Sequence, residues 1–256
     1  IATRSTMLDI YEKIITKDPV AALDELTENA AIYAGIILNK TDTLSDEQRE
    51  SYLDLQRVQG APSYLFIMYL IKHQESLGVT DEDVVKICKL LVNFFIRRNL
   101  TDTPPTRDLT RIFMSFIEAT EQNEYRGADI YTNMRDTLIS VSASDEFFEE
   151  KLRGPVYDDN SGATRFILCM MAKRGMTREN VQDLWRKTNS NQYVWSIEHI
   201  FPQGPNIPDS WVDMIAGGDR EKAKEYQSLY VHTFGNLTIT GYNSTSVSYT
   251  HLRAHE

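Results

Sequence analysis

Two short stretches of the chain carry residue types that could do chemistry together. The first sets the carboxylate of Glu198 beside the imidazole of His199, three residues ahead of a proline that ends regular structure. The second stretch begins about thirty residues later and supplies His232, Asn236 and Asn243. An acid, two imidazoles and two amides in this order are typical of a small metal-dependent site that hydrolyses phosphodiesters.

Phosphodiester hydrolysis needs an activated water, a cation that neutralises developing charge, and rigid placement of both. His199 is the expected general base, because a neutral imidazole near pH 7 can take the proton of the water. Glu198 and Asn243 offer hard oxygen ligands, which suit Mg²⁺ or Mn²⁺. Adjacent strand residues point to opposite faces, so Glu198 reaches a cation only where the strand ends or twists. Asn236 is expected to brace the loop that carries His199.

The elements around these residues follow from the pattern after residue 190. Residues 193–197 and 237–240 are β-prone, whereas Gly217, Gly218 and Asp219 precede a predicted helix over residues 220–230. The order strand, long loop with a helix, strand and turn is that of a ββα-metal site, provided that a helix follows. Each piece alone has a plainer reading, since a lone Glu-His pair is most often structural and Gly-Asn-Leu is often only a turn.

The chain before residue 190 has apolar residues at the spacings of three and four that amphipathic helices require. We therefore expect a mainly α protein, with a multi-helix domain over residues 1–190 followed by a small domain over residues 191–246 that holds the ββα-metal pattern. Besides amphipathic helices near the N-terminus, the predicted helices are 62–77, 81–98, 107–121, 126–140, 144–153, 162–174 and 178–189.

Composition limits the class of protein. The 256 residues are 41% hydrophobic, enough for one sizeable core or a core with a small satellite domain. No apolar stretch is long enough to span a bilayer, and Cys88 and Cys169 lie in apolar runs as reduced core thiols would. We expect a cytoplasmic protein with no membrane partner. The net charge of −10 argues against a protein that coats nucleic acid by electrostatics alone.

Two groups of cations nevertheless stand where they could contact phosphates. Arg97 and Arg98 end an apolar helix, and Lys173 and Arg174 lie in a basic stretch, residues 151–190, with eight Lys and Arg against four Asp and Glu. The first pair could simply complement the helix dipole, or could hold a carboxylate or a phosphate. The second pair could lie on a solvated helix face or on a nucleic-acid contact surface. The sequence leaves both alternatives open.

The whole pattern resembles a known family. Residues 197–203, together with Trp211, His232, residues 235–239 and residues 242–244, are similar to the HNH (His-Asn-His) nuclease domain at the C-terminus of GmrSD-type modification-dependent restriction endonucleases. Residues 95–99 and 164–169 resemble the helical region that precedes this domain, so the resemblance extends from about residue 80 to residue 244.

The resemblance implies divalent-cation-dependent cleavage of DNA, modified DNA included, in restriction and phage defence, with His199 as the base. It also implies an upstream nucleotide-hydrolysing domain of the same full-length protein as a partner, and the first residues read as the cut end of a longer chain.

The chain departs from the family pattern after Ser244. The family continues into a helix with a further asparagine and a lysine, and residues 245–256 contain neither. We expect residues 247–256 to be a non-native tail and the last helix of the ββα site to be missing. The alternative functions are a non-catalytic DNA-binding or regulatory helical module with a vestigial nuclease site, and, less favoured, an RNase, since no feature reads a 2′-hydroxyl.

Overall fold

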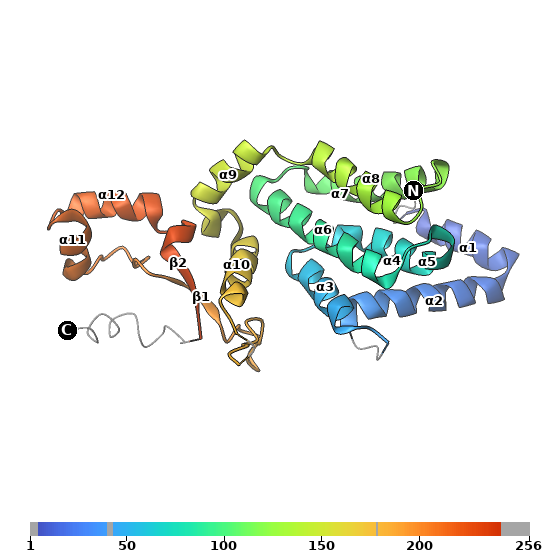
Figure 1. The fold of residues 1–256 in the computed structure, drawn as a ribbon, viewed down its shortest axis with the longest axis horizontal. Helices are drawn as coiled ribbons and strands as arrows, with labels where there is room; N and C mark the ends of the chain where they lie inside the picture. The colour runs from blue at the N-terminus through green and yellow to red at the C-terminus, as the bar shows by residue number, and fades with distance from the viewer. Residues whose placement is uncertain (1–4, 40–42, 178, 242–256) are drawn as a thin grey trace. The chain divides into compact units, whose positions relative to one another are not determined.

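The computed structural model of the protein describes residues 5–39, 43–177 and 179–241 (Figure 1). The chain forms two compact units, with unit 1 built from Ile1–Phe95 and Pro104–Val141 and unit 2 from Ile96–Thr103 and Ser142–Glu256. Both are mainly helical, and the one sheet in the described part has two strands, which confirms the predicted fold class. The functional boundaries predicted at residues 190 and 246 stay predictions.

Unit 1 is a helical bundle whose helix starts follow from local capping residues. Asp18 precedes Pro19 and accepts a hydrogen bond from the backbone N–H of Ala21, and Ser45 forms a capping box with Gln48. Stacked and edge-on phenylalanines, with Phe66 fully buried, help to fill the core. Its elements are α1 (Met7–Lys17), α2 (Pro19–Leu38), α3 (Asp46–Arg57), η1 (Ala61–Ser63), α4 (Tyr64–Lys72), α5 (Gln74–Leu77), α6 (Asp81–Thr101), α7 (Thr106–Gln122) and α8 (Ala128–Val141), the last turns of α6 belonging to unit 2.

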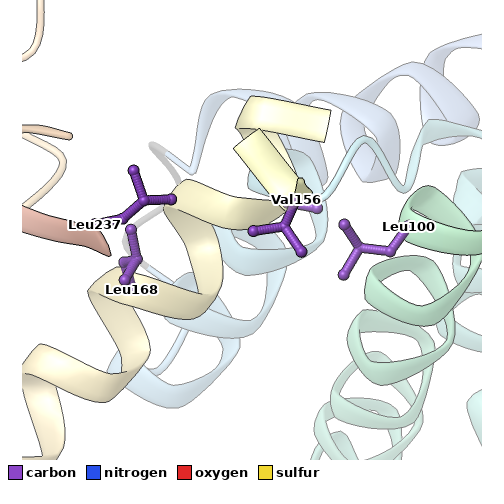
Figure 2. Packing of buried hydrophobic residues seen from close by; sticks show 5 residues of the cluster. Leu100, Val156, Leu168 and Leu237 are labelled. Atoms are coloured by element: carbon purple, nitrogen blue, oxygen red, sulfur yellow. The ribbon is translucent and has the colours of Figure 1, made fainter. Parts of the chain in front are cut away.

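Unit 2 holds the predicted site and has its own hydrophobic core. One cluster joins Leu100, from the end of α6, to residues of α10 and to Leu237 of β2, with Leu100 beside Val156 and Leu237 beside Leu168 (Figure 2). Its elements are α9 (Asp145–Arg153), α10 (Val156–Arg174), β1 (Ser196–His199), α11 (Asp209–Ala216), α12 (Arg220–Tyr230), η2 (Phe234–Asn236) and β2 (Leu237–Thr240).

The two strands pair antiparallel, with Ile197 opposite Ile239 and His199 opposite Leu237. Since side chains alternate along a strand and directly opposed residues share a face, these four lie on one face of the sheet. Ile197 and Ile239 pack on the core cluster that α10 contributes, so this face is turned toward α10. The hydrophobic contacts of the strand pair therefore bring His199 close to α10.

Helix α10 is interrupted near its start, at Asn160, whose backbone is extended (φ −161°, ψ 93°). The Asn160 side chain accepts a hydrogen bond from the N–H of Ala163 (2.9 Å) and donates one to the carbonyl of Asn99 (3.2 Å). It therefore caps the main part of α10 and ties it to the end of α6. Residues 156–159 form a separate first turn.

The predicted helix over residues 178–189 is wrong, because residues 179–189 contain no helix in the described structure. Arg165 explains this arrangement. Its side chain is buried, donates a hydrogen bond to the carbonyl of Leu184 (2.7 Å), and lies 3.6 Å from the ring centre of Tyr193 and 5.2 Å from that of Trp185. Long-range contacts to one guanidinium have overridden the helical propensity of this segment.

Other differences are local. The predicted helix over residues 62–77 divides at His73 into α4 and α5, and α11 was not predicted at all. The strand predicted from residue 193 begins at Ser196, with an isolated bridge between Lys187 and Tyr193 before it. Helix α12 and strand β2 lie where the sequence predicts them.

Among the helices that the structure describes, none combines the length and the apolar character that crossing a membrane requires.

Candidate active site

The two predicted histidines meet in unit 2. His199 ends β1 and His232 lies between α12 and η2, and the Nε2 atom of His199 lies 3.2 Å from the Nδ1 atom of His232. The two rings are almost perpendicular, with centres 5.2 Å apart. This is a ring-to-ring hydrogen bond, in which one nitrogen donates and the other accepts.

Tyr157, in the first turn of α10, holds both rings. Its ring is stacked on that of His232 with 12° between the planes, and meets the ring of His199 edge-on with centres 4.8 Å apart. Its backbone N–H also donates to the carbonyl of His232 (3.2 Å). The aromatic contacts therefore restrict the orientation of both imidazoles.

Asp158 follows in the same turn and extends the arrangement. Its Oδ2 atom lies 3.5 Å from the Nε2 atom of His232, so the ring of His232 lies between this carboxylate and His199. Sequence reasoning missed both Tyr157 and Asp158. They stand about forty residues before His199, and no local pattern links the start of one helix to a histidine on a distant strand.

The environment of His199 favours its neutral form. Burial of the ring lowers the pKa of His199 below its ordinary value, and the neighbouring His232 acts in the same direction. The carboxylates of Glu198 and Asp158 act in the opposite direction, without reversing the shift. A half-buried imidazole that is neutral at physiological pH can accept a proton.

Asn236 lies beside the histidines and is buried. Its side-chain oxygen accepts a hydrogen bond from the N–H of Phe201 (2.7 Å), and its amide nitrogen donates to the carbonyls of Phe201 (3.2 Å) and Val231 (2.8 Å). Its own carbonyl accepts from the N–H of Ile200 (2.9 Å). One side chain thus joins the segment after His199 to the segment before His232, the geometry that the predicted bracing role requires.

Glu198 is placed differently. It belongs to the face of β1 opposite to that of His199, and the hydroxyl of Ser196 donates to its Oε1 atom (3.0 Å). The second predicted ligand, Asn243, lies outside the described residues. Within the described ranges, no group of three or more His, Cys, Asp and Glu residues is placed to hold a metal. Glu198 supplies one hard oxygen donor, which is compatible with Mg²⁺ because this ion keeps several waters.

The two arginines predicted to bind DNA make contacts within unit 2. Arg97 donates to the carbonyl of Ala143 (3.0 Å) and to Asp145 (2.6 Å), and its guanidinium lies over the ring of Phe148. These contacts join the end of α6 to α9. Arg98 lies 3.6 Å from Asp102, and its side chain is 13% exposed. Contact with DNA stays a prediction for both residues.

Lys173 and Arg174 end α10, and Arg174 is exposed. Some cations of the basic stretch, residues 151–190, are engaged within the protein. Arg165 is buried, and Lys151 and Arg153 pair with Asp159 and Glu149 respectively. Contact with phosphates stays a prediction for Lys173 and Arg174.

The described fold and geometry define a mainly α protein with a small ββα-like domain, in which a neutral imidazole ends the first strand. The comparison with protein families identifies that domain more closely. Residues 142–252 match the family described as GmrSD restriction endonucleases, C-terminal domain. The match begins where the longer segment of unit 2 begins, at Ser142.

The match supports the resemblance for residues 142–252, the part of the chain that is similar to the C-terminal domain of GmrSD-type restriction endonucleases. It supports a nuclease-type domain, and such a domain implies DNA as its substrate. No curated protein and no solved structure matches the chain.

Proposed function

We propose that the protein is a divalent-metal-dependent DNA endonuclease of the restriction and phage-defence type, acting in the cytoplasm, with His199 as general base. The observation that carries the proposal lies inside the matched segment. His199 engages one ring nitrogen with His232, while none of the described residues hydrogen-bonds to its Nδ1 atom. A neutral imidazole with one free nitrogen is the group that proton transfer from water requires.

Each neighbouring residue has a defined task in the proposed reaction. His199 accepts a proton from the water whose oxygen attacks phosphorus, while the bond from phosphorus to the leaving oxygen breaks. His232 holds the opposite edge of the His199 ring, and Asn236 fixes the backbone on both sides of the pair. Rigid placement of a base in this way lowers the barrier by orientation.

The proposal includes a bound Mg²⁺ or Mn²⁺. Glu198 and Asn243 are the residues that would hold the ion, which would supply positive charge against the charge that develops on the phosphate and the leaving oxygen. Support comes from the family, since nucleases of the HNH and GmrSD type are generally dependent on divalent metals.

DNA, with or without modified bases, is the proposed substrate. Lys173 and Arg174 are proposed to contact its backbone, with Arg97 and Arg98 as further candidates. A nucleotide-hydrolysing domain upstream in the full-length protein is proposed as a partner on the basis of the family resemblance alone.

The test is nicking of supercoiled plasmid by the purified chain, on DNA with and without modified bases, in Mg²⁺, in Mn²⁺ and in EDTA. We expect cleavage that needs the cation and that His199→Ala reduces by about 100-fold or more, the range for loss of a general base. His73→Ala is the matched control, because His73 is exposed and lies in unit 1. Cleavage that persists in EDTA, or that His199→Ala leaves unchanged, would contradict the proposal.

One outcome would favour the non-catalytic alternative. If the chain retains DNA without cutting it, and charge reversal at Lys173 and Arg174 weakens this retention while His199→Ala does not, the protein is a DNA-binding module. Retention should then fall steeply as salt rises.

A further inference from the structure

We propose that Asp158 is a positioning residue that, through His232, selects the ring tautomer in which His199 keeps its Nδ1 atom free to accept a proton. The catalytic consequence rests on the proposed function. The tautomer itself rests on the geometry of three side chains, and can be tested without measuring cleavage.

The first step is the contact between Asp158 and His232. A carboxylate only accepts hydrogen bonds, and Oδ2 of Asp158 lies 3.5 Å from Nε2 of His232. A proton on that nitrogen is attracted by the carboxylate, whereas a lone pair there would be repelled. A neutral imidazole carries one proton on its two nitrogens, so Asp158 favours Nε2–H on His232 and leaves its Nδ1 atom as an acceptor.

The second step is the effect of the His232 tautomer on the tautomer of His199. The Nδ1 acceptor of His232 lies 3.2 Å from the Nε2 atom of His199, which must therefore be the donor. The single proton of neutral His199 is then on Nε2, and its Nδ1 atom carries a lone pair. Among the residues that the structure describes, none hydrogen-bonds to this nitrogen.

The reversed arrangement would disable the base. If His232 carried its proton on Nδ1, it would donate to Nε2 of His199 and present a lone pair to Asp158. His199 would then carry its own proton on Nδ1, the nitrogen that must accept one. Rotation of either ring would exchange the nitrogens that face one another. Tyr157 restricts such rotation, since it stacks on His232 and meets His199 edge-on.

Asp158 is too exposed to contribute much to packing, so we assign its effect to the placement of the proton on His232. Its side chain is 60% exposed, so replacing it removes little buried surface. The neighbouring Asp159 provides a matched control, because its carboxylate lies in the same turn but pairs with Lys151, at 3.4 Å from Nζ. Asp158→Asn and Asp159→Asn remove the same charge from adjacent positions, and only the first alters the contact with His232.

The experiment is ¹⁵N NMR of the histidine rings in the full chain without metal, at about pH 8, where unperturbed histidines are neutral. Two-bond and three-bond couplings distinguish Nδ1–H from Nε2–H rings. We expect His199 and His232 to be Nε2–H in the wild type and in Asp159→Asn. Asp158→Asn removes the charge and adds a donor, and should move both rings toward Nδ1–H.

Plasmid cleavage supplies the functional readout. Asp158→Asn should lower kcat by about 10- to 100-fold with little change in KM, as losses of supporting groups do. Asp159→Asn should cleave as the wild type does.

A wild-type His232 protonated on Nδ1, or rings that Asp158→Asn leaves in the same tautomer, would overturn the inference. Failure of the proposed function is distinguishable, because His199→Ala would then cleave as the wild type while the rings still respond to Asp158→Asn.

Discussion

At the scale of single residues, the environment of His199 decides what the ring can do. Burial lowers its pKa, and His232 lowers it further, so the folded protein binds fewer protons here than the unfolded chain does at mildly acidic pH. A neutral base and a pH-sensitive fold are two results of the same burial.

The sign of this effect gives a pH prediction. Because the folded pKa of His199 is lowered, its contribution to stability is present above the unfolded pKa of about 6.5 and is lost as the pH falls through the folded value. We expect a smaller fall in Tm between about pH 8 and pH 5 for His199→Gln than for the wild type. Thermal denaturation followed by circular dichroism would measure this, and an equal or larger fall in the variant would contradict the assignment.

Asn236 yields a stability prediction at the same scale. Asn236→Ala removes the partners of the Phe201 N–H and of two carbonyls in a buried place. Since each buried polar group left without a partner costs about 1–3 kcal/mol, the free energy of unfolding should fall by at least about 2 kcal/mol. Chemical denaturation is the measurement. Asn123→Ala is the control, because Asn123 is exposed and donates only to the carbonyl of Ala119 within its own helix end, and a similar loss there would count against the bracing role.

At the scale of secondary structure elements, the sequence predicted the site elements better than the segment before them. Strand β2 and helix α12 follow from β-branched residues and from the Asp219 cap, both local signals. The irregular segment at residues 179–195 could not be predicted, because its conformation depends on Arg165, which is remote in sequence. Tyr157 and Asp158 were missed for the same reason, as their roles exist only once β1 lies against α10.

The buried guanidinium gives the prediction for this segment. Arg165→Lys keeps a positive charge but loses the flat surface over Tyr193 and the geometry of the bond to Leu184, so the unfolding free energy should fall by about 1–3 kcal/mol. The fluorescence of Trp185 reports on the same segment in the folded state. Arg174→Lys, in the same helix and exposed, is expected to change stability by less than about 0.5 kcal/mol. Equal effects of the two substitutions would show that Arg165 does not organise the segment.

At the scale of the whole molecule, unit 2 uses chain from two places. The family match begins at residue 142, but the core of unit 2 also contains Leu100, which comes from the end of α6. A sequence pattern finds the contiguous part and cannot show that a helix end some forty residues earlier completes the core. The mainly α class, in contrast, was predictable from periodicity over most of the chain.

Truncating Leu100 tests whether the end of α6 belongs to the core of unit 2. Leu100→Ala should reduce the unfolding free energy of unit 2 by about 2–5 kcal/mol, since its side chain is buried in the same cluster as Val156. Hydrogen exchange read by mass spectrometry would locate the loss of protection in residues 142–241. Leu65→Ala, at an exposed position of unit 1, is the control, and unchanged protection in Leu100→Ala would remove Leu100 from the core of unit 2.

The break at Asn160 has a consequence for how substitutions combine. It separates the turn that carries Tyr157 and Asp158 from the rest of the helix, yet Val156 of the same turn belongs to the hydrophobic core and Tyr157 packs against it. Because one turn contacts both the histidines and the core, substitutions in the turn and substitutions in the core should have non-additive effects on stability. A change at Val156 is therefore expected to disturb the placement of the histidine rings as well as the core, so that the chemistry and the stability of this domain are coupled.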